Sequence, residues 1–375
     1  MKDFDIAFIG LGAAAMSLAT RLAQQGHDGT AVFIERQTEP VNDRTWCGWG
    51  PSDHVFAPQI IRRWTRWAVS QPGESVNLGH PDTPYEMLRA ADVRAAATHA
   101  IMERHDWLIL PGRTLRQSQR EENCWLLTLD DGQQVRARWV LDARPPPITL
   151  RRPWLWQSFL GFELTGHCFG ESDTVRLMDF LDDEEPLLTF VYELPIAADR
   201  RLVELTRFSP QPANRQALRA DLERLIDERQ WHSASVEREE YGHLPMAPVP
   251  PFSHDRWMRI GTAGGSMRPG TGYAFHAIQR WADECAASMS RGGDPLPPRR
   301  SRLLDWLDGV FLESLWQDPV DARRQFLRLF RNTPSDALVR FLMARPTLRD
   351  ILHVLRALPM TPMLKAAARH CRRPI

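Results

Sequence analysis

Hydrophobic positions near the start of the chain predict a strand, a helix and a second strand in close succession. An apolar strand spans residues 4–9, a turn of small residues follows at 10–15, and a helical pattern runs over 16–25. A second apolar strand covers residues 30–34 and ends on Glu35. This order predicts a βαβ unit, around which the rest of the chain is organised.

Strand-rich and helix-rich stretches follow the βαβ unit. Strands are predicted within 60–79 and at 107–110, 124–129, 134–141, 156–164, 174–180, 187–194, 202–208, 237–246 and 256–260. Helices are predicted at 85–104, 214–230, 274–289 and through most of the chain after Pro298, with breaks at Pro319, Pro334, Pro346, Pro359 and Pro362. Asp131-Gly132 predicts a hairpin turn, and the prolines at 145–147 mark a crossing into a second domain.

The turn at 10–15 has the spacing of a dinucleotide-binding fingerprint. Gly10 lets the chain turn sharply, and Gly12 lets the backbone approach a pyrophosphate at the positive end of the following helix. Ala15 replaces the third glycine, which serves helix–strand packing. Glu35, 23 residues after Gly12, can accept hydrogen bonds from an adenosine ribose, and the adjacent Arg36 is assigned to the same site. The alternative is an ordinary βα turn whose glycines only serve packing.

A second glycine-rich turn follows the predicted strand at 256–260. Its glycines are Gly261, Gly264, Gly265, Gly270 and Gly272. Packed beside the first turn, it can present backbone N–H groups to the ribityl–phosphate arm and ring edge of a flavin. NAD-dependent dehydrogenases seldom need such a cluster, so the two turns together favour FAD over NAD. The alternative is a glycine turn that serves tight helix packing.

These elements predict a mixed α/β (α+β) fold. We expect a Rossmann-like FAD-binding domain formed by 1–149 and 252–298, with 50–110 partly facing the substrate. An inserted antiparallel-sheet substrate domain would cover 150–251, and a helical C-terminal region would cover 299–375. Trp46 and Trp49 lie among glycines in a predicted loop, which suits the wall of a site; alternatively, both tryptophans fill the core.

Composition narrows the class of partner. The 375 residues carry 47 basic and 47 acidic side chains, so no net charge favours a nucleic acid. The five cysteines are scattered, which indicates free thiols in a reducing compartment. No apolar run approaches the ~18–20 residues that span a bilayer, and the first strand follows Met1 at once, so we expect no membrane span and no targeting peptide.

Short motifs are spread from the first residues to about residue 360. They include Arg44-Thr45-Trp46-Cys47, Asp142-Ala143-Arg144, Trp156-Gln157-Ser158-Phe159-Leu160-Gly161, Met178-Asp179-Phe180, Leu202-Val203-Glu204-Leu205-Thr206-Arg207-Phe208-Ser209, Glu240-Tyr241-Gly242-His243-Leu244-Pro245-Met246, Gly261-Thr262-Ala263-Gly264-Gly265 and Pro269-Gly270-Thr271-Gly272-Tyr273. In these motifs the chain resembles the bacterial lycopene cyclase family, a branch of the FAD-dependent, glutathione-reductase-like superfamily. The last two motifs are the most specific, and Asp142 is assigned to the cofactor site.

The resemblance implies cyclisation of the linear end group of a carotenoid without net redox change. Lycopene would become beta-carotene through gamma-carotene, with reduced FAD as cofactor and NAD(P)H as a source of electrons. The resemblance assigns Glu204 as the acid that protonates the substrate. It leaves open whether one or both ends react and whether the ring is β or ε.

A carboxylic acid must stay protonated to act on an alkene, which is a very weak base. Burial among Leu202, Val203, Leu205 and Phe208 would raise the pKa of Glu204, whereas a strand-edge glutamate facing solvent is the alternative. Aromatic walls would stabilise the carbocation. Asp179 is a second candidate, for stabilising the cation or orienting the acid, and Glu240 is a third. His243 and His276 lack metal-ligand spacing, so no metal site is predicted.

The last helices predict contact with a membrane surface. Residues 321–375 hold 12 Arg and Lys against 3 Asp, and their apolar residues recur at helical spacing. Because a carotenoid dissolves in a bilayer, we expect a cytoplasmic enzyme attached peripherally to the inner face of the cell membrane. A helical cap with solvated arginines is the alternative.

Other functions are compatible with the predicted fold. A flavin monooxygenase or dehydrogenase acting on an apolar substrate would consume nicotinamide stoichiometrically. A cyclase of another isoprenoid, such as a meroterpenoid, would share the chemistry. An isoprenoid carrier would keep the fold without the cofactor, although the glycines of both turns argue against it. The sequence leaves the oligomeric state open.

Overall fold

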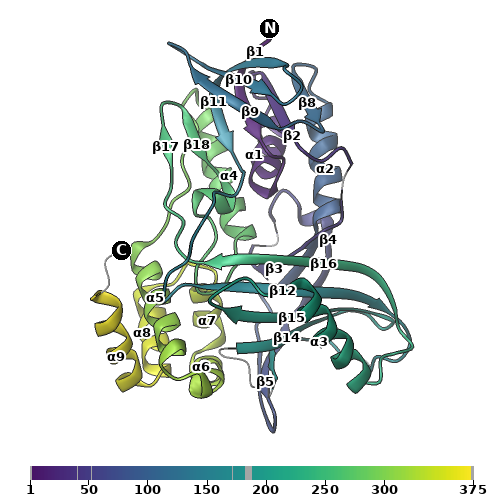
Figure 1. Ribbon diagram of the computed structural model, residues 1–375, viewed down its shortest axis with the longest axis vertical. Helices are drawn as coiled ribbons and strands as arrows, with labels where there is room; N and C mark the ends of the chain where they lie inside the picture. Colours follow the sequence, from purple (N-terminus) through teal and green to yellow (C-terminus); the bar gives the residue numbers. More distant parts are fainter. Residues whose placement is uncertain (1, 40, 52, 171, 182–187, 373–375) are drawn as a thin grey trace.

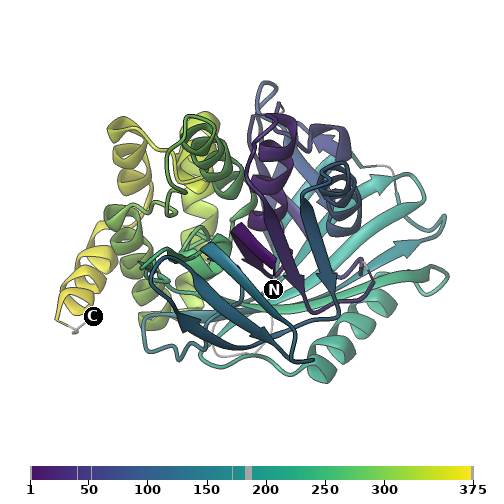
Figure 2. The ribbon, with the colours of Figure 1, turned by 90° about the horizontal axis from the view of Figure 1, so that it is seen from above.

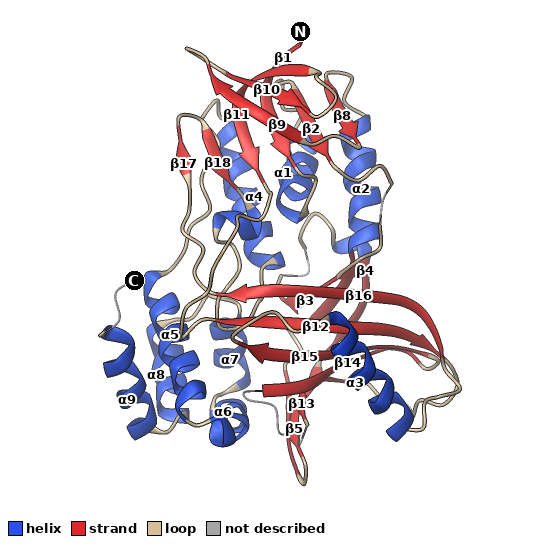
Figure 3. Cartoon of the chain, in the orientation of Figure 1, coloured by secondary structure: helices blue, strands red, loops and turns tan. Residues whose placement is uncertain are grey.

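The computed structural model describes residues 2–39, 41–51, 53–170, 172–181 and 188–372, which form two tiers (Figure 1). The upper tier contains the N-terminal strand with helices packed against its sheet (Figure 1). The lower tier contains a sheet of long strands, with the C-terminal helices to one side of it (Figures 2 and 3). A cavity lies where these parts meet.

The first sheet has the parallel centre of a dinucleotide-binding fold. β1 (Lys2–Ile9) pairs in parallel with β2 (Ala31–Glu35) on one side and β11 (Gln134–Asp142) on the other. The strand order is β17-β18-β11-β1-β2-β8, with β10 and β9 continuing antiparallel from β11. The other strands are β8 (Trp107–Pro111), β9 (Leu115–Arg120), β10 (Trp125–Leu129), β17 (Ser253–His254) and β18 (Trp257–Arg259). The predicted βαβ unit and the 124–141 hairpin are confirmed, whereas β9 was not predicted.

Both faces of this sheet are covered, which explains the nearly continuous apolar run in β1. Ile6 and Phe8 pack against α1 (Ala13–Gln24), α2 (Ala90–Met102) and α4 (Phe275–Met289). Ala7 and Ile9 pack on the other face with apolar residues of β10 and β11. The chain direction and the helix after β1 therefore place the Gly10–Gly12 turn at the carboxyl end of the parallel strands.

The second sheet has the strand order β16-β12-β15-β14-β13-β5-β6. Its strands are β5 (Arg66–Gln71), β6 (Glu74–Gly79), β12 (Leu155–Thr165), β13 (Thr174–Phe180), β14 (Leu188–Ala197), β15 (Arg200–Ser209) and β16 (Ser235–Met246). Helix α3 (Arg215–Glu228) covers one face through Leu218 and Leu222. The strand predicted at 187–194 begins at Leu188, and Leu187 lies outside the described residues.

This sheet differs from the antiparallel sheet expected of residues 150–251. The β5–β6 hairpin extends it at the β13 edge, and β5 runs parallel to β13. Trp67, Val69 and Val76 of the hairpin are buried in the same core as residues of β13, β14 and the C-terminal helices. Burial of these side chains therefore joins the hairpin to a sheet that is distant in sequence.

A small third sheet connects the two tiers. Its order is β3-β7-β4, formed by β3 (Thr45–Trp49), β4 (Ile60–Trp64) and β7 (Tyr85–Arg89), and the turn η1 (Ala57–Gln59) precedes β4. The helix predicted at 85–104 was therefore wrong in its first five residues. Tyr85, Met87 and Leu88 are buried in β7, and the helix α2 begins only at Ala90.

The C-terminal region is helical as predicted. Its helices are α5 (Arg302–Gln317), α6 (Pro319–Asn332), α7 (Ser335–Leu342), α8 (Leu348–Ala357) and α9 (Met360–Cys371). Four of the five prolines lie at helix starts or between helices, as expected. Pro362 does not break the chain, because it lies in the first turn of α9, where a backbone N–H has no partner within the helix.

Candidate active site

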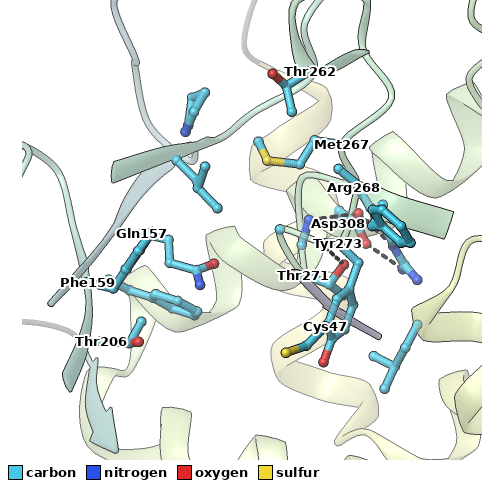
Figure 4. A pocket seen from close by; sticks show the side chains of 18 of the residues that line it. Cys47, Gln157, Phe159, Thr206, Thr262, Met267, Arg268, Thr271, Tyr273 and Asp308 are labelled. Atoms are coloured by element: carbon cyan, nitrogen blue, oxygen red, sulfur yellow. Dashed lines mark hydrogen bonds and ion pairs between the residues drawn. The ribbon is translucent and has the colours of Figure 1, made fainter. Parts of the chain in front are cut away.

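A single cavity of about 1260 Å³ reaches from the first glycine turn to the C-terminal helices. Its walls come from the α1 turn, β3, the face of the second sheet opposite α3, the 260–275 segment and α5–α9. In Figure 4, Gln157, Phe159 and Thr206 of the sheet stand on one side, and Arg268, Asp308 and Tyr273 stand on the other. The cavity therefore brings together residues that are far apart in the sequence.

The first turn fits a diphosphate. Gly12 lines the cavity, precedes helix α1 and has no side-chain cap, so the positive helix end is open to a ligand. A Cβ built on Gly12 would meet no protein atom within 4 Å, and its φ of −84° is ordinary. Packing therefore does not explain a glycine here, whereas close approach of a ligand does. Gly10, with φ of +88°, makes the turn itself.

The other residues assigned to the first turn have different places. Glu35 accepts hydrogen bonds from the backbone N–H groups of Leu11 (2.6 Å) and Gln37 (2.9 Å), so it joins β2 to the turn. Its neighbour Arg36 lines the cavity. Ala15 is fully buried in α1, in agreement with a packing role.

Asp142, at the end of β11, does not line the cavity. It is 5% exposed and forms an ion pair with Arg144 (2.8 Å), and its backbone carbonyl accepts a hydrogen bond from Ile260 N–H (2.9 Å). Asp142 therefore fixes the second turn beside the sheet, and its neighbour Ala143 is the residue that faces the cavity.

The second turn, whose first part is η2 (Gly261–Gly264), packs directly on the first. A Cβ on Gly261, which has φ of +65°, would come within 3.1 Å of Ala14 Cβ in α1. Gly261, Gly270 and Gly272 line the cavity. Gly264 and Gly265 do not, and their N–H groups donate to Ile260 and Thr262 carbonyls. A Cβ on either would clash with backbone oxygen, so packing accounts for these two glycines, and their assignment to the cofactor is not supported.

Two carboxyl groups face the cavity from the second sheet. Glu204 on β15 and Glu240 on β16 are both paired in register with Gly161 of the intervening strand β12. Both line the cavity, and the exposed part of Glu204 faces it. The Thr206 hydroxyl donates a hydrogen bond of 2.9 Å to Glu204. The sequence-based interpretation of Glu204 as a strand-edge residue in bulk solvent is therefore excluded.

The surroundings of the two carboxyl groups favour different protonation states. Burial, and next the charge of Glu240, raise the pKa of Glu204 to about 8. Burial also raises the pKa of Glu240, but the charge of Arg238 and hydrogen bonds from Arg238 (2.6 Å) and Thr45 (2.9 Å) oppose that rise. Glu240 thus ionises first, and Glu204 keeps a proton at neutral pH.

Asp179 lies outside this arrangement. Asp179 pairs with Val191 of β14, which in turn pairs with Leu205 of β15, and both of these side chains pack against α3. Glu204 pairs instead with Tyr192, on the opposite face of the sheet, which lines the cavity. The Asp179 carboxylate forms an ion pair with Arg229 (2.9 Å) and accepts a hydrogen bond from Ser70 (2.6 Å). A β-bulge between Arg176 and Asp179 places both on the same face. This placement argues against the predicted catalytic role of Asp179.

An aromatic cluster that the sequence did not reveal stands beside Glu204. The hydroxyl of Tyr85 contacts those of Tyr192 (2.8 Å) and Tyr273 (3.1 Å), and all three tyrosines line the cavity. They come from β7, β14 and the second glycine turn. Of the two tryptophans at 46 and 49, Trp46 lines the cavity, whereas Trp49 is buried against Tyr85 and Tyr273.

A buried ion pair connects the second glycine turn to the C-terminal helices. Arg268 and Asp308 of α5 are joined by two hydrogen bonds of 3.0 and 2.7 Å (Figure 4). Asp308 also accepts a hydrogen bond from Gly270 N–H (2.9 Å). Helix α5 thereby fixes the loop that forms one wall of the cavity.

The structure brings together one group with the composition of a metal site, which sequence spacing did not indicate. Ligand atoms of His54, Glu86 and His276 lie within 4.8 Å of one another in the described part of the chain. Phe56 N–H donates to His54 Nδ1 (3.2 Å), which puts the ring proton of neutral His54 on Nε2, toward Glu86. Hydrogen bonding accounts for the approach of His54 to Glu86, whereas neither ring nitrogen of His276 has a hydrogen-bond partner among the described residues. We assign the group no metal.

The model of the lycopene cyclase protein family matches residues 5–368. The chain belongs to the lycopene cyclase family. It is 25% identical to a lycopene beta-cyclase of Pantoea ananas over 97% of each chain. It is 26% identical to that of Pseudescherichia vulneris over 96% of each chain, and 27% identical to that of Paracoccus sp. over 96% of this chain and 95% of the relative. The predicted family is confirmed, and the chain is a lycopene cyclase-like enzyme.

Solved structures support the fold of this cyclase family member. A geranylgeranyl bacteriochlorophyll reductase-like protein from Thermoplasma acidophilum superposes with a TM-score of 0.65 at 14% identity, covering 99% of this chain and 100% of that one. A flavoprotein/dehydrogenase from Cytophaga hutchinsonii gives 0.66 at 13% identity and covers 99% of each chain. The predicted Rossmann-like fold is therefore confirmed.

Within the part of the cyclase that the structure describes, none of the helices combines the length and the apolar character needed to cross a bilayer.

Proposed function

We propose that the protein cyclises the linear end group of lycopene to a β-ring, giving beta-carotene through gamma-carotene. One observation carries the proposal: the buried carboxyl group of Glu204, whose pKa burial raises to about 8, faces an apolar cavity that continues to the first glycine turn. The matched relatives are lycopene beta-cyclases, which supports this substrate.

The residues of the two glycine turns fit FAD. Gly12 and the N-terminus of α1 would hold the diphosphate, and Glu35 and Arg36 would contact the adenosine end. The 270–273 loop would lie beside the flavin ring, since Gly270 and Gly272 line the same cavity as Glu204. In its reduced form, which NAD(P)H would generate, the cofactor would supply negative charge near the substrate cation.

The protein's own residues account for the proton transfers. Glu204 donates its proton to the terminal alkene of the linear end group, and the resulting carbocation closes the ring by attack of a second double bond. The π-faces of Tyr192, Tyr85 and Tyr273 stabilise the cation. A ring carbon then loses a proton to the Glu204 carboxylate, which restores the acid, so no electrons or atoms are gained or lost.

Expression in a lycopene-accumulating bacterium tests the function. We expect cyclic carotenes on pigment chromatography of cells that make the protein, and unchanged lycopene in cells that make Glu204→Gln. With purified protein, NADH should be needed only to reduce the cofactor, not in proportion to product. Consumption of one nicotinamide per product would instead support a monooxygenase or dehydrogenase.

We also propose that the protein acts from the cytoplasm on the inner face of the cell membrane. Large apolar side chains on α8 and α9 are exposed, among them Leu348 (78%), Met360 (66%) and Leu364 (62%). Met360 and Leu364, together with Leu352 and Leu355, also line the cavity. Exposed basic residues lie on or beside these helices, namely Arg345, Arg349, Arg356, Lys365, Arg369 and Arg372. An apolar substrate could pass from anionic lipid into the cavity here.

Vesicle flotation tests this surface. The double substitution Leu348→Glu and Leu364→Glu should reduce binding to anionic phospholipid vesicles at least about tenfold, because it replaces apolar contacts with like charge. Met102→Glu is the matched control, since Met102 is 71% exposed but lies on α2 in the other tier. Equal flotation of the double variant and the control, with normal flavin content, would contradict the proposal.

A further inference from the structure

A glycine separates the two cavity-facing glutamates. β12 lies between β15 and β16, so Glu204 and Glu240 belong to strands that are not neighbours. Adjacent strands lie about 4.8 Å apart, so these backbones are about 10 Å apart and the side chains must lean toward each other over β12. Gly161 of β12 is paired with Glu204 on one side and with Glu240 on the other, so it lies between the two glutamates.

The space above Gly161 is filled by the two glutamate side chains. A Cβ built on Gly161 would lie 3.2 Å from Glu240 Cγ, 3.3 Å from Glu204 Cβ and 3.4 Å from Glu204 Cγ. A Cβ here would require the Glu204 or Glu240 side chain to move by a few tenths of an ångström, and a larger side chain would require more. No positive φ explains glycine here, because Gly161 is not among the positive-φ residues of the described chain.

The charges around the pair determine which member is ionised. Arg238 forms ion pairs with Glu240 (2.6 Å) and Glu163 (3.2 Å), and Arg89 forms a second ion pair with Glu163. Arg238 and Arg89 thus already have carboxylate partners, and the guanidinium group of Arg200 also lies 3.9 Å from Glu163. Glu204 has a hydroxyl partner, Thr206, and a carboxyl neighbour. The pair is faced by charged and titratable groups from several elements, namely Arg238 of β16, Glu163 of β12, Tyr192 of β14, Cys47 of β3, Arg89 of β7 and Arg44, which precedes β3.

We propose that Gly161 and Glu240 are positioning residues that make Glu204 an acid. Gly161 provides the space for the two carboxyl groups to meet, and Glu240, held ionised by Arg238 and Thr45, keeps the single proton of the pair on Glu204. The inference rests on the proposed function, in which Glu204 is the proton donor.

The Glu204–Glu240 pair would also stabilise the carbocation of the substrate. Before the reaction, the pair carries one proton and one negative charge. When Glu204 protonates the alkene, the pair becomes doubly negative and the substrate becomes positive. The carbocation therefore forms next to two carboxylates, whose negative charges stabilise it. Proton loss from the ring returns the pair to its starting state. Glu240 thereby both stabilises the cation and favours return of the proton to Glu204.

The pH dependence of two variants tests the proposal. For the native protein, ring formation should fall as pH rises through about 8, because the raised pKa means that Glu204 loses its proton there. In Glu240→Gln this alkaline limb should move down by about one pH unit or more, since a negative neighbour is removed while Arg238 remains. Gly161→Ala should move it in the same direction and reduce kcat at least about tenfold.

Infrared titration of the protonated carboxyl C=O band gives a readout that does not depend on turnover. The band should be absent in Glu204→Gln and should titrate at lower pH in Glu240→Gln and Gly161→Ala. Glu239→Gln is the control, because Glu239 is adjacent on β16 but pairs with Arg215 and Arg219 away from the cavity. Gly170→Ala controls for the added methyl group, since nothing lies within 4 Å of its Cβ position.

The outcomes separate the inference from the proposed function. An unchanged titration midpoint in both Glu240→Gln and Gly161→Ala would overturn the inference, even if the native protein forms rings. Shifted midpoints in a protein that never produces cyclic carotenes would keep the inference about the pair and overturn the function. Flavin absorbance of each variant verifies that the fold is retained.

Discussion

Glu204→Gln should reduce ring formation by about 10²–10⁴-fold while leaving FAD content and the fold unchanged. Glutamine has nearly the same shape as glutamic acid and can still contact Thr206, but it has no acidic proton to transfer. Since Glu204 faces the cavity from the middle of a strand paired on both sides, the substitution leaves the backbone pairing intact. The measurement is the rate of cyclic carotene formation by purified, flavin-loaded protein.

Asp179→Asn is the informative control for this experiment, because sequence analysis assigned both carboxyl groups to the reaction. Asp179 faces α3 and is held by Arg229 and Ser70, so its variant should retain ring formation. A variant at position 204 that remains fully active would remove Glu204 from the mechanism. An inactive, well-folded Asp179→Asn would require a connection between the two faces of the sheet.

Gly12→Val should abolish FAD binding without unfolding the protein. Gly12 has an ordinary φ of −84°, and a Cβ there meets no protein atom within 4 Å, so the native fold accepts a side chain. The added isopropyl group would instead occupy the space in front of the α1 N-terminus, where a diphosphate would lie. We expect at least about a tenfold lower flavin content in the purified protein, measured by absorbance after denaturation.

Thermal unfolding of apo-protein provides the check on this result. Native protein stripped of FAD and Gly12→Val should unfold at similar temperatures, whereas added FAD should stabilise only the native protein. Stabilisation of both by FAD would show that the first glycine turn is not the diphosphate site.

Local patterns sufficed to predict the Rossmann-like scaffold and the position of Glu204 in the cavity wall. The βαβ unit is encoded within 34 residues, and the two glycine turns each follow a strand and precede a helix, so their roles depend on short-range geometry. Glu204 was assigned from a motif and faces the cavity because β15 alternates regularly. Trp46 and Trp49 were expected to share one environment, but β3 places the first in the cavity wall and the second in the core.

Contacts between distant segments could not be predicted. Tyr85, Tyr192 and Tyr273 meet from three strands or loops, and Gly161 is important only because β12 lies between β15 and β16. The β-bulge between Arg176 and Asp179 changes the face of the sheet on which Asp179 lies. The alternation of polar and apolar residues in the sequence does not reveal this bulge. The segment 85–88 fits a helix or a strand, and pairing with β3 on one side and β4 on the other decided for the strand.

The parallel pairing of β5 with β13 limits how this enzyme can be recombined with its relatives. A chimaera that exchanged residues 150–251 alone would pair β13 of one parent with β5 of the other. The side chains of these two strands would then come from different proteins and would not have evolved to pack together. If the hairpin were removed as well, the bare edge of β13 would invite intermolecular strand addition and precipitation. Crossover points for shuffled libraries should therefore keep residues 66–79 and 150–251 from the same parent.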